Sequence, residues 1–226
     1  MTKTEYSGKK NAIIYRWLFY IAGMTTLALG IVLNTKSRLG MAPILSVMFC
    51  LSEIFGWNFS NLTLGYYIFL VAVQFALRGK NYRLADLLQV PLSLVFTRVM
   101  NLFSGAITYI PETIWQKLLV AALAVTATGV GITMAVNMRI LLNPGDGIVQ
   151  AISDRSGLSL GTSKNLFDGG SALVTVALGL ILRGRLVGVG IGTVINVVFV
   201  GRVVALCTWL FKDKMLRLAF GSASVK

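Results

Sequence analysis

Histidine is absent from the 226-residue chain, and only 8 residues are acidic. The absence of histidine removes the side chain that most often shuttles protons or ligates metals near neutral pH. The two cysteines, Cys50 and Cys207, lie inside apolar runs, so neither a metal site nor a disulfide framework is supported and no cofactor is expected. The sequence also shows no nucleophile–base pair and no phosphate-binding loop, so we do not expect an enzyme.

Charged residues of both signs are scarce: they make up 13% of the chain, against about 25% in a soluble domain. Hydrophobic residues make up 56%, and the mean hydropathy is +0.77. Several apolar stretches approach the roughly 20 residues that a spanning helix needs. We therefore expect an all-α, polytopic membrane protein whose main partner is the lipid bilayer. The net charge of +13 then reports topology rather than a nucleic-acid partner.

The chain contains an internal repeat of about 100 residues. A shift of 101 residues places Gly30 on Gly131, Arg38 on Arg139 and Pro43 on Pro144. We expect one membrane domain over residues 1–226, with repeat one at about 13–104 and repeat two at about 118–211. Two such halves usually enclose a site at their interface near the middle of the bilayer.

Each repeat has the same order: a long apolar segment, a short segment opened by proline, and two further apolar segments. The expected helices are Ile13–Leu33, Pro43–Phe55, Leu62–Leu77 and Leu84–Phe103, then Leu118–Met138, Pro144–Arg155, Leu166–Leu182 and Leu186–Phe211. At about 1.5 Å per residue the two short helices rise only about 20 Å, less than the roughly 30 Å hydrocarbon core. They either re-enter the membrane or cross it as tilted spans.

The basic residues favour the re-entrant arrangement. If three long helices per repeat cross and the N-terminus is inside, fourteen loop Lys and Arg residues lie inside and five outside. If all eight segments cross, the split is eleven to eight. The positive-inside rule therefore predicts six spans, two short re-entrant helices, an inverted repeat and both termini in the cytoplasm.

The two proline-led turns are the first candidate site. Proline suits the first turn of a helix, where free N–H groups favour an anion or a polar ligand. In the second turn Asn143 fits the N-cap and Asp146 complements the helix dipole. We expect Pro43, Asn143, Pro144 and Asp146 to contribute to substrate binding. The alternative is that Asn143 and Asp146 only cap a short helix.

Arg98 and Arg202 occupy matching repeat positions, each more than ten residues into an apolar segment. A charge at membrane depth normally faces a cavity or a partner, and a guanidinium suits carboxylate or phosphate. Both arginines are expected to bind substrate in one polar cavity with the proline turns. The alternatives are an ion pair with Asp86, Asp146 or Asp168, or snorkelling to the interface. Asp168 is a weaker candidate, either as carrier of a coupling proton or as a solvated interfacial acid.

The chain resembles the YczE/YyaS/YitT group of bacterial integral membrane proteins. The shared pieces are Arg38-Leu-Gly-Met-Ala-Pro43, Leu87-Leu-Gln-Val-Pro91, Pro144-Gly-Asp146, Gly157-Leu-Ser-Leu-Gly161-Thr162 and the Arg183-Gly-Arg turn that leads to Asn196. Similarity covers about residues 15 to 210. The resemblance implies a fold and a bacterial inner-membrane location, and little chemistry.

Symmetric halves, broken segments and buried arginines favour a transporter or exporter of a small polar or anionic molecule. The alternative is a non-transporting adaptor or assembly factor that acts through a protein partner. A homo-oligomeric assembly is compatible with either.

Overall fold

The computed structural model describes residues 3–79, 84–158 and 160–220. In these ranges every regular element is helical. The helices are α1 (Lys3–Ser37), α2 (Pro43–Phe55), α3 (Phe59–Arg78), the 3-10 helix η2 (Leu84–Leu88), α4 (Gln89–Ala106), α5 (Ile114–Asn137), α6 (Pro144–Ser156), α7 (Leu160–Arg183) and α8 (Ile191–Phe220). Three of the fourteen basic residues that were counted as inside, namely Lys80, Arg83 and Lys226, lie outside the described residues. Ser159 of the Gly157–Thr162 motif lies outside them as well.

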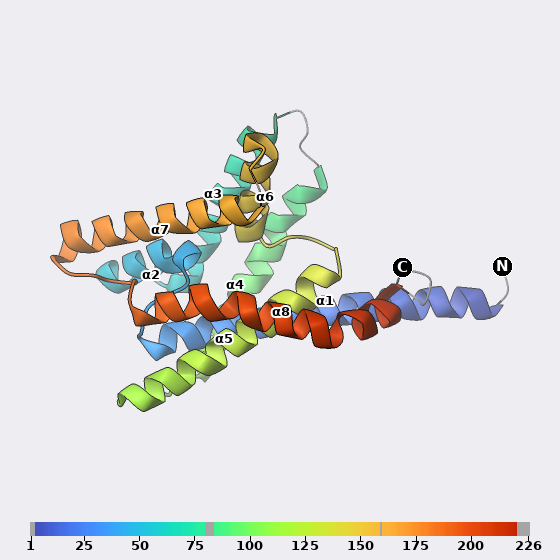
Figure 1. Ribbon diagram of the computed structural model, residues 1–226, viewed down its shortest axis with the longest axis horizontal. Helices are drawn as coiled ribbons and strands as arrows, with labels where there is room; N and C mark the ends of the chain where they lie inside the picture. The colour runs from blue at the N-terminus through green and yellow to red at the C-terminus, as the bar shows by residue number, and fades with distance from the viewer. Residues whose placement is uncertain (1–2, 80–83, 159, 221–226) are drawn as a thin grey trace.

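Six helices are long and apolar enough to cross a membrane: α1, α3, η2 with α4, α5, α7 and α8. This confirms the expected all-helical, multi-pass membrane protein. The helices α2 and α6 have 13 residues each, so each rises about 20 Å at 1.5 Å per residue. The first and last described helices lead to chain ends on the same side of the molecule, whereas the α4–α5 and α7–α8 connections lie on the opposite side (Figure 1).

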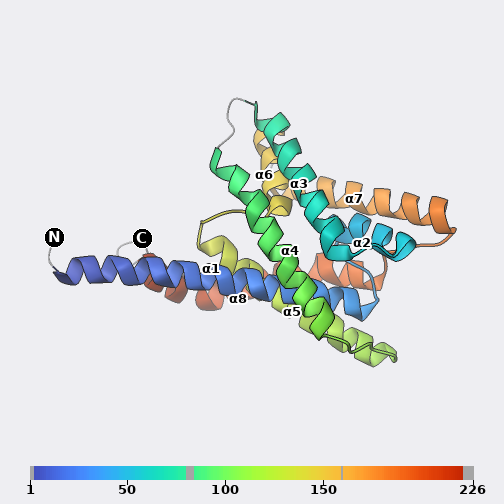
Figure 2. The ribbon, with the colours of Figure 1, turned by 180° about the vertical axis from the view of Figure 1, so that it is seen from behind.

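The centre of the fold is an antiparallel crossing of α1 and α5, and small residues allow their backbones to touch. A Cβ added at Gly131 would stand 2.5 Å from the Leu27 nitrogen, and one at Gly30 would stand 2.6 Å from the Thr128 nitrogen. Glycine at such positions permits close helix packing within a membrane. α1 lies between α8, on the near side in Figure 1, and α4, on the near side in Figure 2.

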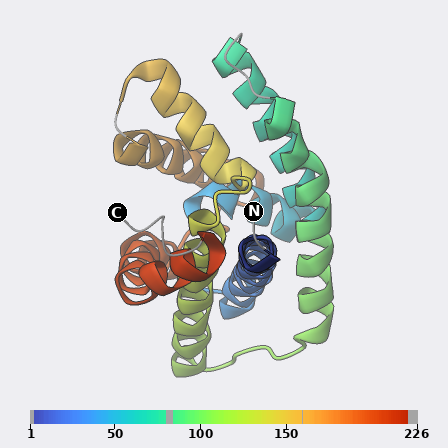
Figure 3. The same ribbon diagram turned by 90° about the vertical axis from the view of Figure 1, so that its right-hand side faces the viewer.

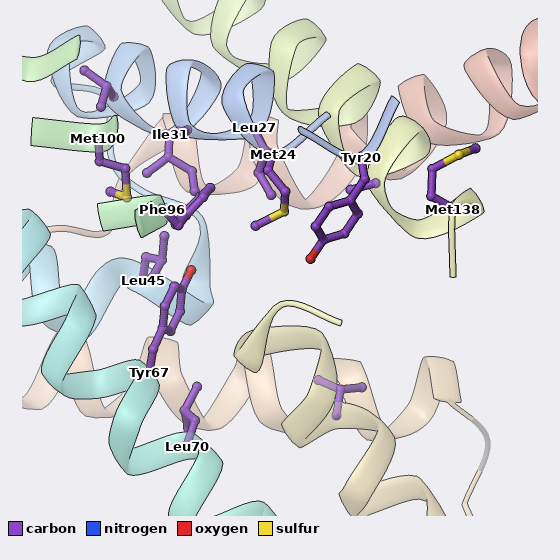
Figure 4. Packing of buried hydrophobic residues seen from close by; sticks show 14 of the residues in the cluster. Tyr20, Met24, Leu27, Ile31, Leu45, Tyr67, Leu70, Phe96, Met100 and Met138 are labelled. Atoms are coloured by element: carbon purple, nitrogen blue, oxygen red, sulfur yellow. The ribbon is translucent and has the colours of Figure 1, made fainter. Parts of the chain in front are cut away.

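The apolar core surrounds this crossing. Tyr20, Met24, Leu27 and Ile31 form one face of α1. Figure 4 shows this face opposite side chains from α2, α3 and α4, namely Leu45, Tyr67, Leu70, Phe96 and Met100. The core therefore joins α2, α3 and α4 to α1. It continues to Met138 at the end of α5.

Each short helix packs against the third helix of the other half. α2 lies on α7, where the Ser46 and Thr175 hydroxyls are 2.6 Å apart. α6 lies on α3, where Gln74 Nε2 donates to the Pro144 carbonyl oxygen at 3.2 Å. Viewed along the long axis, α6 and α3 rise from the same side of the α1–α5–α8 group (Figure 3). These contacts hold the beginnings of α2 and α6 at the centre of the protein.

Several expected boundaries were wrong: α1 begins at Lys3 instead of Ile13, α5 begins at Ile114 instead of Leu118, and α8 ends at Phe220 instead of Phe211. Two further differences have a local cause. α8 begins at Ile191 instead of Leu186, because the backbone at Gly188 has a positive φ of 84° and residues 188–190 pack against the α1–α2 connection. In that contact the Met41 amide donates to the Gly188 carbonyl oxygen at 3.0 Å. α7 begins at Leu160 instead of Leu166, because its first turns are polar and give no hydropathy signal.

Candidate functional site

A large cavity with a volume of about 1190 Å³ opens between the end of α3, the α5–α6 connection and the second half of α6. Its walls come from the end of α3, η2, the α5–α6 connection, one face of α6, and α8. The side chains that matter for ligand binding are charged or polar: Arg78, Asp86, Asn137, Arg139, Gln150, Asp154, Arg155 and Lys212.

The charges of this large cavity are unbalanced. Its two acids are both engaged by Arg78, which lies 2.7 Å from Asp86 and 3.6 Å from Asp154. Within the described ranges, the side chains of Arg139, Arg155 and Lys212 form no ion pair with an acidic residue. Three cations therefore face the cavity without a matching acid. An anion with carboxylate or phosphate chemistry suits such a surface.

The start of α6 follows the α5–α6 connection and is fixed by amide side chains, but Asn143, Pro144 and Asp146 do not line the large cavity. Asn143 is the expected N-cap, and its side-chain oxygen accepts from the Gly145 amide at 3.0 Å. Gln74 and Gln89 are both buried and form a reciprocal pair of hydrogen bonds at 3.4 Å. Because Gln74 also donates to the Pro144 carbonyl, the pair ties α3, α4 and α6 together.

The two short helices meet at their N-termini. Pro43 and Pro144 are both buried at the first positions of α2 and α6. A Cβ added at Gly145 would stand 2.7 Å from Cδ1 of Ile44, so the first turns of the two helices are in contact. The expected approach of the two proline turns is therefore present, and the positive ends of both helix dipoles point toward one central region.

Asp146 and Asp168 lie on the α6–α7 side of this region. Asp146 is in the first turn of α6, which is not one of the six spanning helices. Burial raises the pKa of its carboxyl, Lys164 lowers it and Asp168 raises it again. Asp168 lies two turns inside α7 and pairs with Lys164 at 3.2 Å, while its other oxygen, Oδ1, is buried with no hydrogen-bond partner. Asp168 is thus a paired, mostly buried acid.

Arg98 and Arg202 line neither the large cavity nor a smaller cavity beside α2. Arg98 is exposed, and its Nη1 donates to Asn61 Oδ1 at 3.1 Å. Asn61 precedes Gln74 by thirteen residues of α3, about 20 Å along the helix, so Arg98 is far from the start of α6. Arg202 is also exposed and stacks on Phe199 of its own helix at 5.5 Å. The structure therefore does not bring these arginines together with Asn143 and Asp146.

A second, smaller cavity of about 270 Å³ lies beside α2. It is formed by the end of α1, α2, the start of α3 and the end of α4. Its charged side chains are Lys36, Arg38 and Glu53. No ion pair joins Glu53 to a basic residue in the part of the chain that the structure describes.

Arg139, Arg155 and Lys212 were not among the residues singled out from the sequence. Hydropathy places all three in or near loops, where basic residues are ordinary. The available signal was the repeat, which aligns Arg139 with Arg38. The structure adds that both have the positive φ values, 50° and 56°, that glycine or asparagine usually adopts after a helix.

A family of unknown function (DUF6198) matches the chain over residues 14–208. No curated protein and no solved structure matches it. The resemblance to the YczE/YyaS/YitT group stays a prediction.

Proposed function

The chain belongs to the family of unknown function DUF6198, and we propose that it transports a small anion across a bacterial inner membrane through the large cavity. The observation that carries the proposal is the set of three cations, Arg139, Arg155 and Lys212, that face this cavity without an acidic partner. A cavity with this excess of cations attracts anions and disfavours cations.

The proposal includes an inverted relation between the two halves of the chain, and three observations support it. The helices α1 and α5 cross antiparallel, and the α2–α7 contact has its counterpart in the α6–α3 contact. The short helices also end alike: Gly56 and Gly157 both have φ of 71°, and their amides donate to Ser52 and Ser153 at 2.9 and 3.0 Å. Matching backbone details at aligned positions favour a common origin for the halves, and inverted halves are a frequent design in transporters.

The distribution of basic residues supports cytoplasmic termini. Arg16 donates to the Met138 and Arg139 carbonyl oxygens at 2.7 and 2.8 Å, so it lies on the same side as the large cavity. That cavity gathers Arg78, Arg155 and Lys212 on this side as well. The positive-inside rule assigns a side so rich in basic residues to the cytoplasm. The large cavity would then open toward the cytoplasm.

The alternative is a membrane adaptor that binds a partner protein. The exposed flanks of α7 and α8 favour it, because most of the surface of these two helices is uncovered by the rest of the chain. The large polar cavity favours transport, because an adaptor needs no such space. Lipid alone is sufficient to cover apolar helix flanks, so transport accounts for more of the structure.

Uptake into proteoliposomes tests the proposal. Labelled phosphate, sulfate, succinate and lactate are offered to vesicles that contain the full chain. We expect uptake of at least one anion, a loss of more than tenfold in Arg139→Gln and Lys212→Gln, and little change in Lys214→Gln, a basic residue outside the cavity. If none of the four anions enters faster than in empty vesicles, transport of small anions by this protein is refuted.

A further inference from the structure

The large and the small cavity are built from equivalent positions of the two repeats. With the same shift of 101 residues, five residues of the small cavity correspond to five of the large one. The pairs are Thr35 and Val136, Lys36 and Asn137, Arg38 and Arg139, Phe49 and Gln150, and Glu53 and Asp154. Two unrelated surface hollows would not share five aligned positions, so the cavities are counterparts.

We propose that the small cavity is a second binding site for the same oxyanion, at the opposite face of the membrane, with Arg38 in the position that Arg139 has in the large cavity. This inference rests on the proposed function. It adds a second site and a residue, Arg38, that the proposed function does not require.

The backbone at Arg38 and Arg139 supports a role for their side chains. Each arginine follows the end of a long helix, α1 or α5, and each has a left-handed backbone conformation that costs less for glycine. Both side chains are exposed and line a cavity, so neither is needed to fill the core. Arginine at both positions is therefore better explained by what its guanidinium binds than by the turn.

The charges of the two cavities have the same sign. The small cavity has Lys36 and Arg38 against a single acid, Glu53. The large cavity has four basic residues against Asp86 and Asp154. Glu53 and Asp154 occupy equivalent positions, so each cavity pairs an excess of cations with one acid at the same place. Both cavities therefore favour the same ligand class, a small anion that accepts hydrogen bonds from guanidinium groups.

The difference in size indicates which site is open. The large cavity has a volume of about 1190 Å³ and the small one about 270 Å³. In a transporter made of inverted repeats, the halves exchange conformations, so that the open cavity closes as its counterpart opens. The structure then corresponds to the state that is open on the side of the chain ends, and a phosphate or a short carboxylate still fits the small cavity.

Thiol labelling tests the second site without relying on transport. Cys50 and Cys207 are first replaced by alanine. Thr35→Cys then reports on the small cavity, and Val136→Cys on the large one. A membrane-impermeant maleimide is applied to intact cells or to inside-out vesicles, with phosphate, sulfate, succinate and lactate each tested as the competing anion. We expect Thr35→Cys to react from outside and Val136→Cys from inside, each at least threefold more slowly with one of the anions.

Charge variants then assign the protection to each arginine. Arg38→Gln should abolish the protection of Thr35→Cys, and Arg139→Gln should abolish the protection of Val136→Cys. Arg185→Gln should change neither, because Arg185 lines neither cavity. Arg38→Gly serves as a second variant that suits the left-handed backbone, in case the glutamine variant folds poorly.

Three outcomes would overturn the second site without refuting anion binding in the large cavity. They are protection of Val136→Cys alone, protection of Thr35→Cys that persists in Arg38→Gln, and labelling of both sites from one face. Protection of both sites without flux into proteoliposomes would support two binding sites and refute transport. Protection of neither would refute both.

Discussion

Ile44 in α2 lies against the backbone of Gly145 in α6, where a Cβ at position 145 would stand 2.7 Å from Ile44 Cδ1. These residues are 101 positions apart and belong to aligned helix starts. The contact shows that the first turns of the two short helices lie against each other. The free amides of both helix starts therefore converge on one central region.

This contact predicts a disulfide between the helix starts. In a background with Cys50 and Cys207 replaced by alanine, the Ile44→Cys/Gly145→Cys pair should oxidise readily, because Ile44 Cγ1, the atom that a cysteine sulfur would replace, lies 3.7 Å from a Cβ built at Gly145. Gel mobility after cleavage in the α4–α5 connection reports the cross-link. The Ile44→Cys/Gly201→Cys pair is the control, since it also spans the cleavage site and no atom lies near a Cβ built at Gly201. Failure of the first pair to cross-link would show that the helix starts are apart.

The buried pair Gln74 and Gln89 predicts a non-additive loss of stability. Gln74→Leu leaves the buried amide of Gln89 without its partner and removes the side-chain donor to the Pro144 carbonyl oxygen; an unpaired buried polar group costs about 1–3 kcal/mol. The double variant Gln74→Leu/Gln89→Leu removes both amides. Its loss of stability should therefore be smaller than the sum of the losses in Gln74→Leu and in Gln89→Leu. Thermal unfolding in detergent measures the two single variants and the double variant. Strict additivity of the two single losses would contradict a direct hydrogen-bonded pair.

Glycines at the α1–α5 crossing should respond differently from exposed ones. A Cβ at Gly131 would stand 2.5 Å from the Leu27 nitrogen and 2.7 Å from the Gly23 oxygen, so Gly131→Ala pushes two backbones apart. Such overpacking costs about 1–3 kcal/mol. Gly201→Ala, with no atom near its Cβ, should be neutral or stabilise α8 by up to about 1 kcal/mol. Equal melting temperatures for the two variants would argue against the close crossing.

Replacing Arg139 by glycine is expected to stabilise the fold and to reduce anion transport. Its φ of 50° is costly for a side chain with a Cβ, so Arg139→Gly should stabilise the fold by up to about 1 kcal/mol. The same change removes a cavity cation and should reduce anion uptake more than tenfold. Arg139→Gln keeps the backbone cost and removes the charge, so it should lose uptake without gaining stability. If Arg139→Gly takes up anion as fast as the unchanged protein, the side chain of Arg139 has no role in transport.

Much of the fold follows from the sequence because its signals are local. α2 begins at Pro43 and ends at Phe55 as predicted, and α6 extends one residue past its predicted end. Proline at the first helical position and glycine after the last one mark both helices. The six long helices follow from apolar length alone. The polar start of α7 was missed because Lys164 and its neighbours contribute no hydropathy.

The candidate site was predicted only in part, since it depends on which face of each helix meets a neighbour. The proline turns and the Asn143 cap follow from local chemistry. Arg98 has the depth in its segment that suggested a buried charge, but it is exposed and bonded to Asn61 at the far end of α3 from Gln74. The cations of the large cavity come from distant loops and helix ends, and only the tertiary fold brings them together.

Counterflow in proteoliposomes tests the central claim most directly, because it requires both binding and alternating access. Vesicles loaded with unlabelled anion, chosen from phosphate, sulfate, succinate or lactate by the uptake assay, are diluted into a trace of the same anion in labelled form. The account predicts a transient accumulation of label above equilibrium with the unchanged protein and with Arg185→Gln, and none with Arg139→Gln. Accumulation that is equal in Arg139→Gln, or absent from the unchanged protein with all four anions, would contradict it.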